Sequence, residues 1–143
     1  MKGKLLKLKI SRATFAEMEV LLFDSRDDQL VMLEEILARI GCNVSSVTHE
    51  DECYTKLIGG KFDLLIFDHG IPRLDVDAFV NQVEIIDRCT PVAMMVTLPS
   101  RFYEDKYGCS GIDFLLFKPF GYNEISRLVK EALQYSLKLR KAS

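Results

Sequence analysis

The chain has few cysteines and no long apolar runs. Its four cysteines form no CxxC pair and show no Cys/His ligand spacing, so nothing indicates a structural zinc site or a dithiol redox motif. No stretch approaches the ~20 apolar residues of a membrane span, and no stretch has the apolar core of a secretory signal. We therefore expect a reduced, cytoplasmic protein with buried or incidental thiols and no membrane span in this chain.

Excess charge of one sign, internal repeats and low-complexity tracts are also missing. The formal net charge is -2 and the pI is near 5.7, so the composition indicates no nucleic-acid partner. Lysines and arginines crowd residues 2–12 and 138–141, and we interpret them as solvated flanks rather than binding arms. At 143 residues the chain has the length of one ordinary domain.

Strand and helix patterns alternate five times from Val20 onward, and each strand ends in polar or Gly/Pro residues. This alternation predicts a doubly wound α/β fold, with a five-stranded parallel sheet and helices on both faces. The second strand mixes polar with apolar residues, so we place it at an edge, in the flavodoxin-like order 2-1-3-4-5. The predicted strands cover residues 20–23, 43–47, 64–67, 92–96 and 114–117.

Helical stripes of apolar residues fill the intervals between these strands. The first predicted helix runs from about residue 28 to residue 40, and Gly41 lies just past its end, where glycine is favoured. Asp77 is expected to cap the third helix. A short fourth helix is expected over residues 101–107, where the periodic signal is weakest.

The first residues do not belong to the alternating pattern. Residues 4–10 alternate imperfectly, like an edge strand, but they precede the first core strand and have no helix to follow them. We therefore divide the chain into residues 1–18, an N-terminal extension or the tail of a preceding domain, and residues 19–143, a single α/β domain.

Three charged residues directly follow predicted buried strands. Asp24, Asp68 and Lys118 end the first, third and fifth apolar runs. Ligands of open α/β sheets bind beyond the carboxyl ends of the strands. Because the first and third strands are neighbours in the predicted order, we expect Asp24 and Asp68 to lie side by side. Two acids and a lysine at one edge of the sheet predict a site for a cation together with an anion.

In this order and spacing, Asp24, the segment Asp68-x-x-Ile71-Pro72 and the segment Lys118-Pro119-Phe120 resemble the receiver domain of two-component response regulators and hybrid histidine kinases. The resemblance covers roughly residues 19–141. It implies that Asp68 accepts a phosphoryl group from a histidine kinase or a histidine phosphotransfer protein. It also implies that Lys118 contacts Asp68 or a phosphoryl oxygen, and that the Lys118-Pro119 peptide bond is cis.

The resemblance further implies a Mg2+ site made by Asp24, Asp68 and the backbone carbonyl of Gly70. Receivers usually carry two adjacent acids after the first strand, but Ser25 stands at the second position here. This substitution removes one negative charge, so we expect weak Mg2+ binding. The acids at positions 27–28 could compensate, but they are better placed to start the following helix.

The switch residues of the family are also altered. Counting back from Lys118 places Val96 where a hydroxyl is expected at the end of the fourth strand, and Thr97 follows one residue late. Leu115 stands where the family commonly has an aromatic residue. Thr97 is therefore either an ordinary strand-end threonine or the phosphoryl-binding hydroxyl, brought into place by a one-residue bulge.

These observations leave more than one functional hypothesis. The chain is a phospho-accepting receiver, with at most self-phosphorylation and autodephosphorylation activity, or it is a degenerate receiver that acts as a phosphorylation-independent interaction or dimerisation module. In both cases residues 101–140 form the expected contact face, including that of a homodimer. A flavin- or nucleotide-binding flavodoxin-like protein fits less well, because the acidic segment 25–28 would repel phosphate.

Overall fold

The computed structural model describes residues 18–97 and 111–142. The helix expected over residues 101–107 and the edge strand expected over residues 4–10 lie outside this part of the chain. The described elements, in chain order, are β1 (Glu19–Phe23), α2 (Asp27–Ile40), β2 (Asn43–Val47), α3 (Glu50–Gly59), β3 (Leu64–Asp68), α4 (Val76–Ile86), β4 (Val92–Val96), β5 (Phe114–Phe117) and α6 (Tyr122–Ala142).

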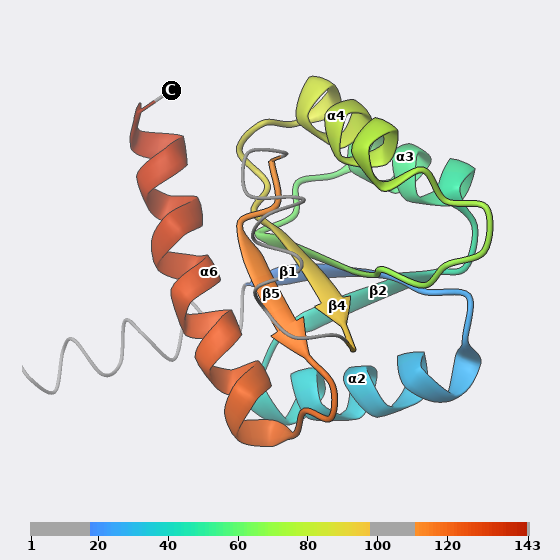
Figure 1. Cartoon of the computed structure of the whole chain (residues 1–143). Coiled ribbons are helices and arrows are strands. Elements are labelled where there is room, and N and C mark those ends of the chain that lie inside the picture. Colours follow the sequence, from blue (N-terminus) through green and yellow to red (C-terminus); the bar gives the residue numbers. More distant parts are fainter. Residues whose placement is uncertain (1–17, 98–110, 143) are drawn as a thin grey trace, which may run out of the picture.

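The five strands form one parallel sheet in the order β2-β1-β3-β4-β5. Helices α2 and α6 pack against one face of this sheet, and α3 and α4 pack against the other (Figure 1). The fold class and the strand order predicted from the alternating pattern are therefore confirmed. Each face encloses its own apolar cluster, because alternate residues of a strand point to opposite sides.

The burial of the strands explains their sequences. Every residue of β3 and β4 is buried, so their runs hold no polar residue before Asp68. On one face Phe79 of α4 packs between Phe23 and Phe67, with ring centroids 5.3 and 4.9 Å away. In β2 only Val47 is fully buried, as its position at the edge of the sheet requires.

Two predicted helix ends had different outcomes. Gly41 ends α2 with a φ of 108°, and its N–H bonds to the carbonyl oxygens of Leu37 and Ala38 at 3.1 Å, as expected for glycine just past a helix. The prediction that Asp77 caps α4 is wrong. Asp75 caps this helix by accepting a backbone N–H of the first turn at 3.1 Å, and Asp77 lies inside that turn, where an acid is also favourable.

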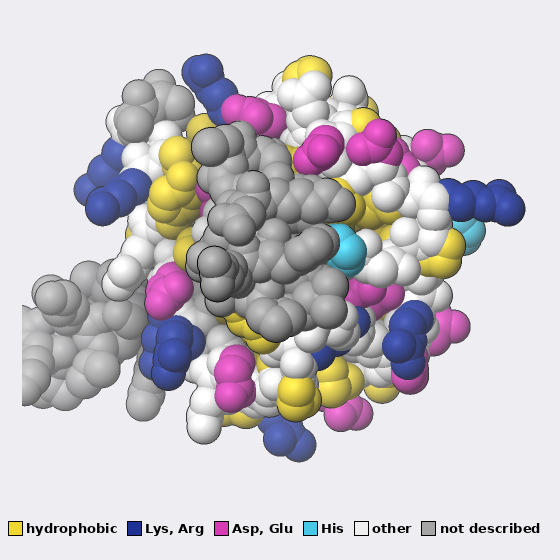
Figure 2. Space-filling model, viewed as in Figure 1, with side chains coloured by type: hydrophobic (Ala, Val, Ile, Leu, Met, Phe, Trp, Pro, Cys, Tyr) yellow, Lys and Arg dark blue, Asp and Glu magenta, His cyan; other side chains and the backbone are white. Residues whose placement is uncertain are grey.

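The surface mixes charges of both signs. On the face shown in Figure 2, Lys and Arg side chains are interspersed with Asp and Glu side chains. Within residues 18–97 and 111–142, no helix is long and apolar enough to cross a membrane. Large apolar side chains are nevertheless exposed on several elements, among them Val31, Met32, Ile58, Ile85, Phe117, Tyr122, Tyr135 and Leu137.

Candidate functional site

Asp24 and Asp68 lie on neighbouring strands at the carboxyl edge of the sheet. Phe23 of β1 pairs with Phe67 of β3, so the two aspartates occupy the next position on each strand. Asp24 is fully buried and Asp68 is 6% exposed, so both carboxyl groups lie below the surface. The strand order predicted from the sequence placed Asp24 next to Asp68, and the structure shows them in neighbouring positions.

Lys118 supplies the positive charge at this edge. Its Nζ lies 2.5 Å from Oδ1 of Asp68, and only 21% of the lysine side chain is exposed. The backbone N–H of Lys118 donates to the carbonyl oxygen of Val96 at 2.8 Å, which fixes the lysine at the end of β4. The Lys118-Pro119 peptide bond is cis, as the resemblance implied. The ammonium group neutralises one of the two buried negative charges.

Gly70 holds the other oxygen of Asp68. Its backbone N–H donates to Oδ2 of Asp68 at 2.9 Å. A Cβ at position 70 would lie 3.1 Å from that oxygen, so a larger residue would crowd the carboxylate. The sequence singled out Gly70 for its carbonyl group. The structure shows a contact of its N–H, and the role of the carbonyl group stays a prediction.

Gln29, in the first turn of α2, is the site residue that the sequence analysis missed. Its Nε2 donates to Oδ2 of Asp24 and lies 3.4 Å from Oδ1 of Asp68. The amide therefore lies between the two carboxylates. An acid-rich stretch followed by glutamine is an unremarkable helix start, and only the packing of α2 on the sheet shows where this side chain points. One signal could have identified Gln29: it lies five residues after Asp24, in the first turn of the helix that follows the carboxyl end of β1.

The electrostatics of Asp24 follow from its burial. Desolvation is the largest influence and raises the pKa of the Asp24 carboxyl group. Hydrogen bonds from Gln29 and from the backbone N–H of Arg26 favour the ionised form and oppose this rise, the latter at 3.1 Å. The charge of Asp68 raises the pKa further, and that of Lys118 lowers it. The site thus holds two acids and one base in close electrostatic contact.

The other acids near β1 do not take part. Ser25 is exposed, and Asp27 and Asp28 lie in the exposed first turn of α2. Asp28 pairs with Arg26 at 3.1 Å, and this hydrogen bond lowers the pKa of its carboxyl group. The compensation considered for positions 27–28 is therefore not seen. These acids start a helix, where negative charge is favourable.

The switch positions lie at the ends of β4 and β5. Val96 is 1% exposed and packs into the cluster between the sheet and helices α3 and α4. Val96 of β4 pairs with Phe117 of β5, so Thr97 and Lys118 directly follow the paired ends of two neighbouring strands. Thr97 is exposed, and β4 is regularly paired up to Val96. The role of the Thr97 hydroxyl stays a prediction. Leu115 is partly buried against the same cluster.

The residues at this edge fit a weak Mg2+ site. Asp24 and Asp68 offer the oxygen ligands that Mg2+ prefers, with water completing the shell. Among residues 18–97 and 111–142, no three His, Cys, Asp or Glu side chains come together as a metal-binding group. Ser25 supplies no carboxylate, so Asp24 and Asp68 are the two acids that this edge offers to the ion.

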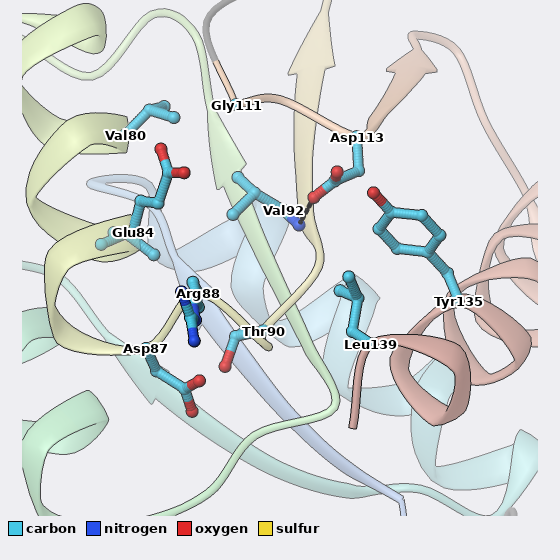
Figure 3. Close-up of a pocket in the computed structure, with 11 residues that line it drawn as sticks. Val80, Glu84, Asp87, Arg88, Thr90, Val92, Gly111, Asp113, Tyr135 and Leu139 are labelled. Carbon is cyan, nitrogen blue, oxygen red and sulfur yellow. Dashed lines mark hydrogen bonds between the residues drawn. The ribbon is translucent and has the colours of Figure 1, made fainter. Parts of the chain in front are cut away.

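A pocket of the described residues lies elsewhere. Its volume is about 340 Å³, and it opens between α4, α6 and the amino ends of β4 and β5 (Figure 3). Its polar walls come from Glu84, Asp87, Arg88, Asp113 and Tyr135. This pocket is at the opposite end of the sheet from Asp68. It therefore contributes nothing to the chemistry of the carboxyl edge.

Sequence comparisons connect the chain with signalling proteins. No protein-family model matches it. It is 28% identical over 123 residues to hybrid signal transduction histidine kinase L of Dictyostelium discoideum, a match that covers 79% of this chain and 7% of that protein. It is 26% identical over 119 residues to the alkaline phosphatase synthesis transcriptional regulatory protein PhoP of Bacillus subtilis, covering 82% of this chain and 49% of that protein. The chain thus spans less than half the length of either relative.

Solved structures show the same fold. The signal receiver domain of an HD domain-containing protein from Pseudomonas fluorescens superposes with a TM-score of 0.78 at 20% identity, covering 88% of this chain and 93% of that one. The chemotaxis response regulator CheY4 of Vibrio cholerae superposes with a TM-score of 0.74 at 24% identity, covering 81% of this chain and 98% of that one. The chain therefore has the fold of response-regulator receiver domains, as the resemblance implied.

Proposed function

We propose that this receiver fold accepts a phosphoryl group on Asp68 as part of a two-component or phosphorelay pathway. The observation that carries the proposal is the pairing of a nearly buried carboxylate with a lysine ammonium at 2.5 Å, next to a second buried carboxylate. Of the described acids, Asp24 and Asp68 are the two that are buried, and of these two Asp68 is paired with a lysine. A buried acid with a neutralising base is a good phosphoryl acceptor.

The residues divide the work of the transfer. A carboxylate oxygen of Asp68 attacks phosphorus, and the bond from phosphorus to the donor's nitrogen or oxygen breaks, leaving an aspartyl phosphate. Lys118 neutralises charge on the acceptor and on the incoming phosphoryl oxygens. Gly70 keeps the approach to Asp68 free of side-chain atoms. Mg2+, held by Asp24, Asp68 and the Gly70 carbonyl, would add charge neutralisation when bound.

The phosphoryl donor is proposed to be a histidine kinase or a histidine phosphotransfer protein, in the cytoplasm. The response would be presented by β5 and α6, where Phe117, Tyr122, Tyr135 and Leu137 leave 37%, 48%, 38% and 50% of their areas exposed. Exposed apolar side chains on adjacent elements favour protein contact. A homodimer through this face is one such contact, and light scattering before and after phosphorylation would test it.

A second hypothesis is a degenerate receiver that docks partners without phosphorylation. It is favoured by the exposed Ser25, which supplies no charge to the edge, and by Val96, which is committed to the apolar core. Under this hypothesis the Asp68–Lys118 pair is a structural ion pair. The two hypotheses differ in one measurable property, the uptake of phosphate.

The test is incubation with acetyl phosphate and Mg2+ followed by intact mass measurement. We expect one phosphoryl group on the parent chain and none on Asp68→Asn. The matched control is Asp113→Asn, at the opposite edge of the sheet, which should accept phosphate like the parent. Uptake by Asp68→Asn, or no uptake by a folded parent chain, would reject Asp68 as the acceptor and favour the docking module.

A further inference from the structure

Each oxygen of the two buried aspartates accepts a hydrogen bond from the protein. Oδ1 of Asp24 accepts the backbone N–H of Arg26 at 3.1 Å, and its Oδ2 accepts Nε2 of Gln29. Oδ1 of Asp68 accepts Nζ of Lys118 at 2.5 Å, and its Oδ2 accepts the backbone N–H of Gly70 at 2.9 Å. Each of the four carboxylate oxygens therefore has an N–H donor from the protein.

Gln29 differs from the other three donors because it faces both acids. Its Nε2 also lies 3.4 Å from Oδ1 of Asp68, at the long limit of a hydrogen bond. The opposite amide orientation would place the Oε1 oxygen against two carboxylates, which is repulsive, so the N–H side must face them. A donor group placed between two like charges reduces their repulsion, as a bound cation would.

We propose that Gln29 is an internal competitor of the divalent cation, whose amide holds Asp24 and Asp68 together in the metal-free protein. This proposal concerns the regulation of the proposed phosphorylation site, and in that sense it rests on the proposed function. For a cation to bridge the two acids, the Gln29 side chain must move out of the space between them. The other N–H donors can stay, because a carboxylate oxygen accepts more than one contact.

Two consequences follow for the metal-free and metal-bound protein. Without a cation, the amide stabilises the acid pair, so its loss should lower the melting temperature. With a cation, the amide opposes binding, so its loss should tighten binding. A residue that merely helped to orient Asp24 for the metal would show the opposite second effect, because its loss would weaken binding. The two roles are therefore separable by one affinity measurement.

The experiment compares Mg2+ affinity and melting temperature for the parent chain, Gln29→Met and Gln82→Met. Methionine keeps the length and flexibility of glutamine but donates no N–H. Gln82, exposed on α4 away from the site, is the matched control. Mg2+ binding is followed by amide chemical shifts in a titration. We expect Gln29→Met to melt lower without metal and to bind Mg2+ on the order of tenfold tighter, and Gln82→Met to change neither quantity.

A second variant covers the case in which Gln29→Met does not fold. Gln29→Glu keeps the side-chain shape, replaces the donor by a third carboxylate, and should show the largest Mg2+-induced rise in melting temperature of the series. Mg2+ affinity in Gln29→Met equal to or weaker than that of the parent would overturn the proposal. A Gln29→Glu chain that gains no more stability from Mg2+ than the parent would overturn it as well.

These readouts do not depend on phosphate uptake. A parent chain that takes up no phosphate, together with tighter Mg2+ binding by Gln29→Met, would reject the proposed function and support the competitor role. Phosphate uptake by the parent, together with unchanged Mg2+ affinity in Gln29→Met, would support the proposed function and reject the competitor role.

Discussion

The two ends of the sheet each hold a pair of aspartates next to the strands, but in different surroundings. At the carboxyl edge Asp24 and Asp68 are buried and lie side by side, Gln29 contacts both, and Lys118 pairs with Asp68. At the amino edge, aspartates precede β3 and β5 and contact the backbone of the neighbouring strand. The same residue type thus serves two purposes in one sheet.

The aspartates of the amino edge repeat one hydrogen-bond arrangement. Asp63 precedes β3, and its Oδ2 accepts the N–H of Glu19 at 2.9 Å while its own N–H donates to the carbonyl of Glu19 at 2.8 Å. Asp113 precedes β5, and it makes the same two bonds with Val92, both at 2.8 Å. Each aspartate closes a ring with the start of an adjacent strand, and so fixes where pairing begins.

The aspartates of the two edges differ in the groups that surround their carboxylates. An aspartate that accepts backbone N–H groups of its sheet has its charge used by the fold. An aspartate whose neighbours are another acid and a lysine has charge left for a ligand. An acid beside a strand is therefore a better candidate for chemistry when a second buried acid and a lysine lie next to it. The following predictions test this division.

The largest expected effect on stability comes from removing the base at the carboxyl edge. Lys118→Met leaves Asp68 nearly buried beside Asp24 without its counter-charge. We expect the free energy of unfolding to fall by about 2–3 kcal/mol, below the full cost of breaking a buried pair because the lysine side chain is partly exposed. Urea denaturation at neutral pH measures it.

The double variant Lys118→Met, Asp68→Asn provides the control for this prediction. Removing both charges should restore much of the lost stability, because no unpaired charge then remains. Equal stability of parent and Lys118→Met would mean that the two buried acids tolerate each other without a base. The contrast between the edges would then fail.

A smaller effect is expected at the amino edge. Asp63→Ala and Asp113→Ala should each lower the free energy of unfolding by about 1–2 kcal/mol, because each leaves a strand-end N–H without its acceptor. Neither should change phosphate uptake, measured by intact mass. A loss of uptake in a folded Asp113→Ala chain would show that the two edges are coupled and not independent.

The sequence was sufficient to predict the sheet and the three charged residues of the carboxyl edge. The runs around Leu65 and Met94 have no polar position because both faces are covered, and such runs indicate central strands of a parallel sheet. The flavodoxin-like strand order, chosen because the mixed second strand suits an edge, then places Asp24 beside Asp68. Lys118 followed from the same logic, since the carboxyl ends of parallel strands share one edge.

The parts that were missed depend on packing between elements. Gln29 was overlooked because its role requires the angle at which α2 crosses the sheet, which no local pattern contains. The paired bonds of Asp63 and Asp113 were overlooked because an aspartate before a strand is also an ordinary turn residue. The cap of α4 went to Asp75 rather than Asp77 because both acids precede the apolar stripe. Local signals alone do not choose between them.

The smallest expected effect is a pH dependence located at Asp113. The residue is exposed as a whole, but its carboxyl group turns inward between the Val92 N–H and the Tyr135 hydroxyl (Figure 3). Desolvation is the largest influence and raises the pKa of the Asp113 carboxyl above its usual 3.8, Glu84 raises it further, and the two hydrogen bonds oppose the rise. The native state therefore holds this proton more tightly than the unfolded chain.

The sign of the effect follows from linkage. A raised native pKa gives stability that is fully present below pH 3.8 and is lost as the pH rises through the native value. Relative to Asp113→Asn, the parent should therefore lose stability as the pH rises through this range, measured by urea denaturation at a series of pH values. Asp28→Asn is the control of opposite sign. Since the hydrogen bond from Arg26 lowers the pKa of Asp28, the parent should there lose stability as the pH falls. Parallel stability curves for the parent and Asp113→Asn would show that the Asp113 carboxyl is solvated like any surface acid, and would leave its two backbone bonds as its whole contribution.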